Sequence, residues 1–89
     1  MEFQTENGRI YAADGEKLLA EITFPAADGV ADINHTFVDD SLRGKGIAGQ
    51  LMEKAVEKIE ADGLKVRTTC SYAAKWFEKH TEKSVLLEK

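Results

Sequence analysis

The chain has 89 residues, 43% of them hydrophobic and 31% charged, and a formal net charge of −4, which together predict one globular domain over residues 1–89. Its acidity argues against nucleic-acid binding, which needs a broad basic surface, and no apolar run approaches the roughly 18–20 residues that span a bilayer. The single cysteine, Cys70, allows no internal disulfide and the acidic start of the chain contains no apolar signal core, so we expect a cytoplasmic protein.

The first half of the chain alternates between apolar and polar residues as strands do. EFQTE is followed by the hairpin signal NG and then by RIYAA, and DGE leads into KLLAEITFPA. In that last segment one face carries Leu18, Ala20, Ile22 and Phe24. After a third turn signal, ADG, the segment VADINHTFV (residues 30–38) is expected to place Ala31, Ile33, His35 and Phe37 on one face. Strand-like segments joined by turns predict an antiparallel meander.

A helical period replaces this alternation after residue 46. Apolar residues then recur three and four apart, and the stripe consists of Ile47, Leu51, Met52, Ala55, Val56 and Ile59. Glycine suits the left-handed position that follows a helix, so Gly63 predicts that this helix ends near Asp62.

The remaining segments predict a strand, a helix and a short terminal strand. LKVRTTC (residues 64–70) has the composition of a buried strand, Ser71 is a candidate N-cap for a helix over YAAKWFEKH, and the apolar end of TEKSVLLEK predicts a last strand. Segment 30–38, the long helix and segment 64–70 form one βαβ unit, so these two strands should be parallel. The predicted fold class is therefore α+β, a mostly antiparallel sheet with one parallel βαβ pair and two helices.

The loop RGKGIAG (residues 43–49) contains three glycines, two cations and no acid, which lets its backbone approach a negatively charged group closely. GKGIAG matches the dinucleotide pattern G-x-G-x-x-G, but that fold opens with its βαβ unit and needs more parallel strands than this chain provides. An acidic residue should also follow about 20 positions later to hold the ribose, where this chain has Thr68, Thr69 and Cys70. We therefore reject a dinucleotide site.

The same loop resembles the motif Q/R-x-x-G-x-G/A, which marks acetyl-coenzyme A binding in the GNAT N-acetyltransferase superfamily. The matching positions are Arg43, Gly44, Lys45, Gly46, Ile47 and Ala48. Strands, glycine loop, amphipathic helix and second parallel strand also follow the family's order over nearly the whole chain. The second half is similar to a small, minimal branch of the family, with matching residues at Cys70, Tyr72, Trp76, Phe77 and His80. The resemblance implies a minimal acyl-CoA N-acyltransferase fold that uses acetyl-CoA or coenzyme A.

The physics of the loop also favours a phosphate. The first turn of a helix leaves N–H groups unpaired, and the helix dipole places about half a positive charge there. Gly44, Gly46 and the small Ala48 would let a pyrophosphate approach those amides. The resemblance further implies that the backbone near Phe37 and Val38 bonds the pantetheine arm. The expected coenzyme-binding set is Phe37, Val38, Arg43, Gly44, Lys45, Gly46, Ile47, Ala48 and Gly49.

Two acids depart from the family pattern just before the loop. Asp40 stands where many relatives have proline, and Asp39 lies beside it. Because carboxylates near a phosphate would weaken its binding, we expect both to point outward. The alternative is a plain strand-to-helix turn that uses glycine for its geometry alone.

Three residues are candidates for acyl-transfer chemistry. Cys70, at the expected start of the second helix, either accepts the acetyl group, contacts the thioester or pairs with coenzyme A, or is an inert buried cysteine. His35 is either a general base or a hydrogen-bonded core histidine, because it alternates with apolar residues. Tyr72 either protonates the leaving thiolate, as the resemblance implies, or packs against Trp76. No clustered ligand spacing predicts a metal site.

The leading hypothesis is an acetyl-CoA-dependent N-acetyltransferase that acts on a small amine or a protein amino group. The alternatives are a coenzyme A-binding module with little turnover, and a carrier in which Cys70 holds an acyl group or forms a disulfide. Larger relatives devote further strands and loops to the acceptor, so the acceptor pocket here is expected to be open, completed by a second subunit, or absent. We expect a monomer or a weak homodimer.

Overall fold

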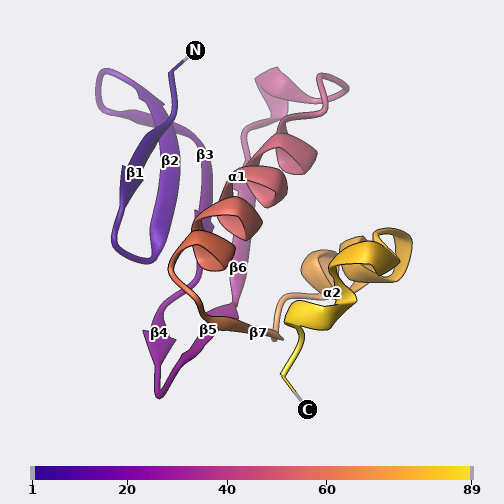
Figure 1. The fold of residues 1–89 in the computed structure, drawn as a ribbon. Coiled ribbons are helices and arrows are strands. Elements are labelled where there is room, and N and C mark those ends of the chain that lie inside the picture. The colour runs from indigo at the N-terminus through magenta and orange to yellow at the C-terminus, as the bar shows by residue number, and fades with distance from the viewer. Residues whose placement is uncertain (1, 89) are drawn as a thin grey trace.

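The computed structural model describes residues 2–88, which form two small sheets, two α-helices and two 3₁₀ turns (Figure 1). The strands are β1 Gln4–Glu6, β2 Arg9–Asp14, β3 Lys17–Thr23, β4 Ala26–Ala27, β5 Val30–Ile33, β6 His35–Val38 and β7 Lys65–Thr68. The α-helices are α1 Ile47–Ala61 and α2 Ser71–Lys79, and the 3₁₀ turns are η1 Asp40–Leu42 and η2 Thr81–Leu86.

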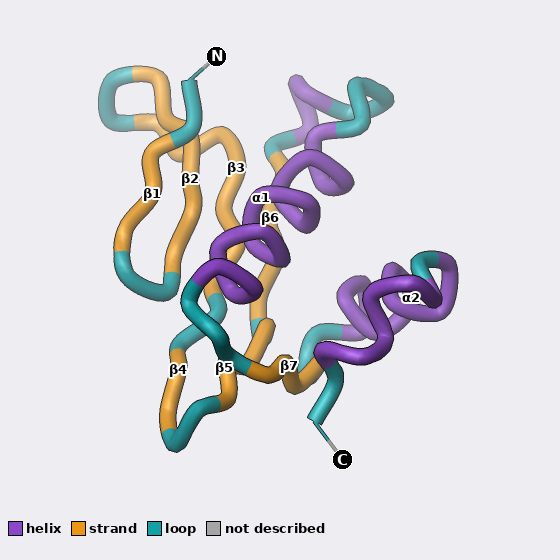
Figure 2. The backbone as a smooth tube through the Cα atoms, viewed as in Figure 1, coloured by secondary structure: helices purple, strands orange, loops and turns teal. Residues whose placement is uncertain are grey.

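The sheets confirm the predicted α+β class. One sheet is antiparallel with strand order β1-β2-β3-β6, and the other has the order β4-β5-β7, in which β5 and β7 are parallel. Helix α1 crosses over β2, β3 and β6, and α2 lies beyond β7 (Figure 2). The predicted βαβ unit is therefore present, with the glycine loop at the start of its helix.

The predicted strand 30–38 is interrupted at Asn34. Residues 30–33, before Asn34, pair with β7, whereas residues 35–38, after it, pair with β3. Thr23 of β3 is the register partner of His35, and its carbonyl also accepts the Asn34 N–H at 3.2 Å, so two residues of one strand stand opposite one residue of the other. This is a β-bulge, which adds one residue to a strand and reverses the alternation of side chains beyond it. The expectation that Ala31, Ile33, His35 and Phe37 share a face is therefore wrong.

Beyond the bulge the exposed and packed residues change places. Ala31 and Ile33 are completely buried in β5, but His35 and Phe37 of β6 are exposed. Thr36 and Val38 instead turn toward the interior and are half-buried. The bulge thus moves His35 out of the position that a core histidine would need.

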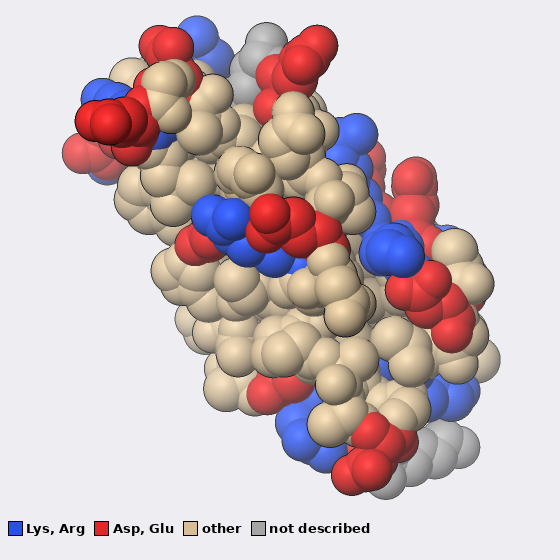
Figure 3. All heavy atoms as spheres, turned by 90° about the vertical axis from the view of Figure 1, so that its left-hand side faces the viewer, with Lys and Arg blue, Asp and Glu red and all other residues tan. Residues whose placement is uncertain are grey.

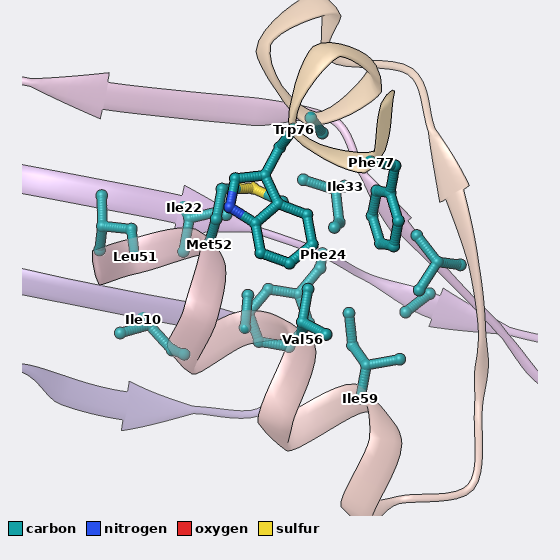
Figure 4. Close-up of a cluster of buried hydrophobic side chains, with 14 of the residues drawn as sticks. Ile10, Ile22, Phe24, Ile33, Leu51, Met52, Val56, Ile59, Trp76 and Phe77 are labelled. Atoms are coloured by element: carbon teal, nitrogen blue, oxygen red, sulfur yellow. The ribbon is translucent and has the colours of Figure 1, made fainter. Parts of the chain in front are cut away.

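The hydrophobic core is formed where both sheets pack against the two helices (Figure 4). All six residues of the predicted α1 stripe are at most 6% exposed. Trp76 of α2 points toward Met52 and Val56 of α1 and meets the Phe77 ring edge-on, with ring centroids 5.0 Å apart. Packing against α1 therefore fixes α2 beside the start of the long helix.

The ends of the elements agree only in part with the sequence. Helix α1 ends at Ala61 and Gly63 has a φ of +72°, as predicted. The N-cap of α2 is Cys70 and not Ser71, which is the first helical residue. In place of the predicted last strand, the 3₁₀ turn η2 is followed by a single parallel bridge between Leu87 and Val66.

The surface is charged but mixed in sign. On the face drawn in Figure 3, basic side chains lie next to acidic ones, without a wide area of either sign. Ion pairs such as Arg9 with Glu6, at 3.1 Å, account for part of this pattern. Within residues 2–88 no helix is long and apolar enough to cross a membrane.

Candidate functional site

The first turn of α1 presents unbonded backbone amides. Gly46 caps the helix with φ +70°, and the first intrahelical bond is donated by Gln50 to the Gly46 carbonyl, at 3.2 Å. The N–H groups of Ile47, Ala48 and Gly49 find no acceptor in the described chain, and the turn contains no acidic residue. These amides and the positive end of the helix dipole are suited to an anion.

A cavity of about 310 Å³ lies directly in front of these amides. It is lined by Val38, Asp39, Asp40, Leu42, Arg43, Gly44, Gly46, Ile47, Ala48, Gly49 and Tyr72. Gly44 and Gly46 have φ of +82° and +70°, a conformation that other residues adopt only with strain. A Cβ added at either position would meet nothing within 4 Å, so the space beside the amides is open.

The charged side chains of the loop only partly favour an anion. Arg43 is 79% exposed and bonds to Asp40 at 2.7 Å, so part of its charge is already neutralised. Asp40 points outward as expected, whereas Asp39 bends back and accepts bonds from the Ser41 hydroxyl and N–H, at 2.6 and 3.1 Å. These bonds, with a smaller contribution from Lys17, lower the pKa of Asp39. Backbone amides are therefore the main attraction of the site.

The free edge of β6 continues from this cavity toward β7. Asp39 donates its N–H to the Leu19 carbonyl at 2.8 Å. In an antiparallel pair every second residue bonds to the neighbouring strand, so the N–H and C=O groups of Phe37 also point toward β3. The N–H and C=O groups of Thr36 and Val38 point the other way, and they bond to no backbone group of β7 or α2 in residues 2–88. Of the two predicted backbone contacts, Val38 lies on this open edge and Phe37 does not.

The gap between β6 and β7 closes at Cys70. The Ile33 carbonyl accepts the N–H groups of both Thr69 and Cys70, at 3.1 and 2.9 Å, where the parallel pairing ends. The Cys70 sulfur lies 3.6 Å from the Thr36 hydroxyl. The thiol therefore stands at the end of the gap farthest from the α1 amides, with Thr36 across from it.

The surroundings of Cys70 favour its thiolate. Burial alone would raise the pKa of the thiol, but the N–H of Ala73, the Thr36 hydroxyl and the N–H of Tyr72 all stabilise the charged form. Together they outweigh burial and lower the pKa of Cys70. The sequence did not point to Thr36, because regular alternation through Asn34 would have placed it with Asp32 on the polar face.

Of the other predicted catalytic residues, Tyr72 lies near Cys70, whereas His35 lies apart from it. His35 projects from the opposite side of β6 to Thr36, and its Nε2 is 3.2 Å from the Glu21 carboxylate. Tyr72 is 38% exposed and lines the cavity, and burial of part of its ring raises the pKa of the phenol, so it is protonated at neutral pH. The structure thus joins Tyr72 and Cys70 to the α1 side of the molecule and leaves His35 on the outer face.

His80 packs against Trp76 at the end of α2. Its ring stacks on Trp76 with centroids 3.9 Å apart, and its Nδ1 lies 2.8 Å from the Trp76 carbonyl. In the described part of the chain, no three His, Cys, Asp or Glu side chains converge where a metal ion could bind.

Comparison with known proteins identifies the family. A family model described as GCN5-related N-acetyl-transferase matches residues 9–86. The solution structure of a GCN5-like protein from Staphylococcus aureus superimposes with a TM-score of 0.80 and 31% identity, covering 98% of this chain and 87% of that one. The ribosomal-protein-S18-alanine N-acetyltransferase of Escherichia coli shares the fold alone, with a TM-score of 0.66 and 17% identity over 86% of this chain and 54% of that one.

Curated relatives match over a shorter stretch. Protein NATD1 of Gallus gallus and of Mus musculus are each 35% identical over 51 residues, which is 57% of this chain. The match spans 46% of the length of each relative.

Proposed function

The chain belongs to the GCN5-related N-acetyltransferase family, and from that premise we propose that it binds acetyl-CoA and transfers the acetyl group to an amine. The observation that carries the proposal is the row of unbonded amides at Ile47, Ala48 and Gly49, facing an open cavity with no acid in the helix turn. A bare helix N-terminus of this kind fits the pyrophosphate of coenzyme A.

The rest of the coenzyme would follow the free edge of β6. From the cavity, the backbone groups of Val38 and then Thr36 offer hydrogen bonds to the two amides of the pantetheine arm, as in the addition of a strand. The arm would end near Cys70, where the gap closes. This places the thioester between β6 and β7, within reach of an acceptor.

The chemistry requires a neutral amine and a proton donor. The amine nitrogen attacks the thioester carbonyl, the carbon–sulfur bond breaks, and the coenzyme A thiolate leaves and takes up a proton. Tyr72 is protonated and lines the cavity, so we assign it the delivery of that proton. His35, whose Nε2 lies 3.2 Å from the Glu21 carboxylate on the outer face, would take the proton of an amine that arrives from that side.

A second candidate function rests on Cys70. Its lowered pKa and its contact with Thr36 favour a thiolate that attacks the acetyl carbonyl directly. A bond would form between the acetyl carbon and the Cys70 sulfur as the bond to coenzyme A breaks, which leaves acetyl-Cys70 and the coenzyme A thiolate. The chain would then act as an acyl carrier.

Measurement of coenzyme A release and intact mass separates the two functions. Direct transfer predicts thiol release that depends on a supplied amine, tested over a panel of small amines and peptides with free amino groups, and that persists in Cys70→Ala. The carrier predicts an acetyl mass gain on the protein without any amine, and its loss in Cys70→Ala. Absence of acetyl-CoA binding by calorimetry would refute both.

The reactivity of Cys70 gives a prediction that needs no substrate. We expect the rate of alkylation by iodoacetamide to rise with pH around a midpoint below that of an ordinary cysteine, because hydrogen bonds stabilise the thiolate. Thr36→Val removes one of these donors and should move the midpoint to higher pH. In denaturant the two proteins should titrate alike. Equal midpoints for the two folded proteins would show that Thr36 does not act on the thiol.

Removal of the Asp40 charge should strengthen binding. Asp40 borders the cavity and forms an ion pair with Arg43. Asp40→Asn therefore removes a negative charge that would repel the phosphate, and it frees the Arg43 guanidinium to bind the phosphate. Because both side chains are exposed, we expect acetyl-CoA to bind only about two- to fivefold more tightly. Asp14→Asn, an equal change of charge at an exposed position outside the cavity, is the control for calorimetry. Weaker binding by Asp40→Asn would contradict this electrostatic account.

A further inference from the structure

His35 belongs to a cluster of charged side chains on the outer face of the antiparallel sheet. Tyr11 and Phe37 are the direct partners of Glu21 in the strands on either side of β3, and Arg9 and His35 stand two residues away from them. Long side chains at such diagonal positions on one face of a sheet are within reach of one another. The register therefore places Glu21 between Arg9 and His35.

Both oxygens of the Glu21 carboxylate have a close neighbour. Oε2 accepts a hydrogen bond from the Arg9 Nε at 2.5 Å, and Oε1 lies 3.2 Å from the His35 Nε2. Arg9 is held in turn by the Tyr11 ring, whose centroid is 3.8 Å from the guanidinium carbon. Only 16% of the Glu21 side chain is exposed, compared with 50% of the His35 side chain. The carboxylate therefore occupies a fixed place beside a more exposed imidazole.

The contact with Glu21 decides which nitrogen of His35 carries the proton. An ionised carboxylate is an acceptor only, so a neutral imidazole that faces it at 3.2 Å is favoured with its proton on Nε2. Nδ1 then keeps its lone pair, and it is the ring nitrogen that can take up a proton. Without the carboxylate, a half-exposed histidine would populate both tautomers.

We propose that Glu21 is a positioning residue for acyl transfer, which holds His35 in the tautomer that deprotonates the acceptor amine at Nδ1. The inference rests on the proposed function, in which the amine arrives from the outer face. As the amine nitrogen bonds to the acetyl carbon and the carbon–sulfur bond breaks, the amine proton passes to Nδ1 of His35. The ring then carries a proton on each nitrogen, and its positive charge lies beside the Glu21 carboxylate.

Glu21→Gln is the informative variant, because it changes the pattern of donors while the side chain keeps its size. The new amide has one acceptor oxygen and one NH₂ donor. Arg9 can only donate, so it should take the oxygen, which leaves the NH₂ group to face His35. Nε2 must then accept a hydrogen bond, and the ring proton moves to Nδ1. The variant should therefore have the opposite tautomer, without a lone pair on Nδ1.

The first measurement is the long-range proton–nitrogen nuclear magnetic resonance spectrum of the imidazole rings, recorded on the whole chain where they are neutral. Of the two histidines, His80 is an internal reference, because its Nδ1 lies 2.8 Å from the Trp76 carbonyl and must carry the proton. We expect His35 in the Nε2–H form in the wild type and in the Nδ1–H form in Glu21→Gln. A wild-type His35 in the Nδ1–H form, or the same tautomer in both proteins, would overturn the positioning role.

The second measurement is the rate of coenzyme A release from acetyl-CoA, with the amine of the panel that the wild type acetylates fastest. His35→Ala removes a general base and should lower kcat about 100-fold, and Glu21→Gln should lower it at least about tenfold with KM nearly unchanged. The double variant should be no slower than His35→Ala, because Glu21 acts through the imidazole. Wild-type turnover in Glu21→Gln, or losses that add in the double variant, would refute the role of Glu21. Release by the wild type with no amine of the panel would instead refute the proposed function.

A matched control separates the contact with His35 from the charge of the face. Glu6 also pairs with Arg9, at 3.1 Å, but three strand spacings, about 14 Å, separate it from His35. Glu6→Gln therefore makes the same change of charge and removes an ion pair of the same guanidinium. It should keep the wild-type tautomer and a turnover within about twofold of the wild type. If it changed both as Glu21→Gln does, the contact between Glu21 and His35 would not be the cause, and the inference would be wrong.

Discussion

Replacement of Ala48 by glutamate is expected to leave the apo protein at least as stable as the wild type and to weaken acetyl-CoA binding about 100-fold, or about 2.7 kcal/mol. Ala48 is the second residue of α1, half-buried beside the cavity, and its N–H has no acceptor in the described chain. A carboxylate in the first turn interacts favourably with the helix dipole, by about 0.3–1 kcal/mol. The same carboxylate would occupy the place of a phosphate and repel it. The opposite signs of the two effects make the variant informative.

Thermal denaturation and calorimetric titration measure the two effects in one preparation. Gln50→Glu is the matched control, because it adds the same charge two residues later at an exposed position that does not line the cavity. It should bind acetyl-CoA within about threefold of the wild type. If Ala48→Glu bound as tightly as the wild type, the α1 amides would not hold the pyrophosphate.

Val38→Pro should leave the fold intact and weaken acetyl-CoA binding by at least about tenfold, the loss of one hydrogen bond together with obstruction of the edge. The Val38 N–H points away from β3 and bonds to nothing in residues 2–88, so its removal breaks no bond of the sheet. Proline is tolerated in a strand at such an edge position. Its ring would, however, fill the space where the pantetheine arm should lie.

Two further variants test this edge. Val38→Ala shortens the same side chain but keeps the N–H, and it should bind nearly as well as the wild type. Phe37→Pro removes an N–H that the register turns toward β3, and it should lower the melting temperature markedly. Normal affinity in Val38→Pro, measured by calorimetry with circular dichroism as the check of folding, would mean that the coenzyme does not follow β6.

Local sequence signals were sufficient to predict the glycine loop and the helix that follows it. The apolar stripe of α1 and the glycines at 44, 46 and 63 depend on residues that are neighbours along the chain, and each was found where expected. The same holds for the βαβ unit, because a helix between two strands of one sheet gives a parallel pair.

The bulge at Asn34 could not be predicted in this way. Ala31, Ile33 and Phe37 keep a period of two, and the polar residues between Ile33 and Phe37 are compatible with that period, so an inserted residue could not be recognised. The bulge nevertheless determines the geometry of the candidate site, because it separates β6 from β7 and leaves the backbone groups of Thr36 and Val38 without a neighbouring strand. It also turns the His35 side chain outward. Contacts between strands distant in sequence determine where such a bulge lies.

The start of α2 was misplaced for a related reason. Serine is a preferred N-cap residue, so Ser71 was the natural prediction. In the structure the N–H groups of Thr69 and Cys70 both reach the Ile33 carbonyl, which ends the strand earlier and makes Cys70 the cap.

Coenzyme binding by the α1 amides can be measured directly by a nuclear magnetic resonance titration of the nitrogen-15-labelled protein with acetyl-CoA. We expect saturable shifts that are largest for the amides of Ile47, Ala48 and Gly49, followed by those of Val38 and Thr36, with little change in β1 and β2. Shifts confined to other surfaces, or none at millimolar ligand, would contradict the claim that the bare amides of α1 bind the coenzyme.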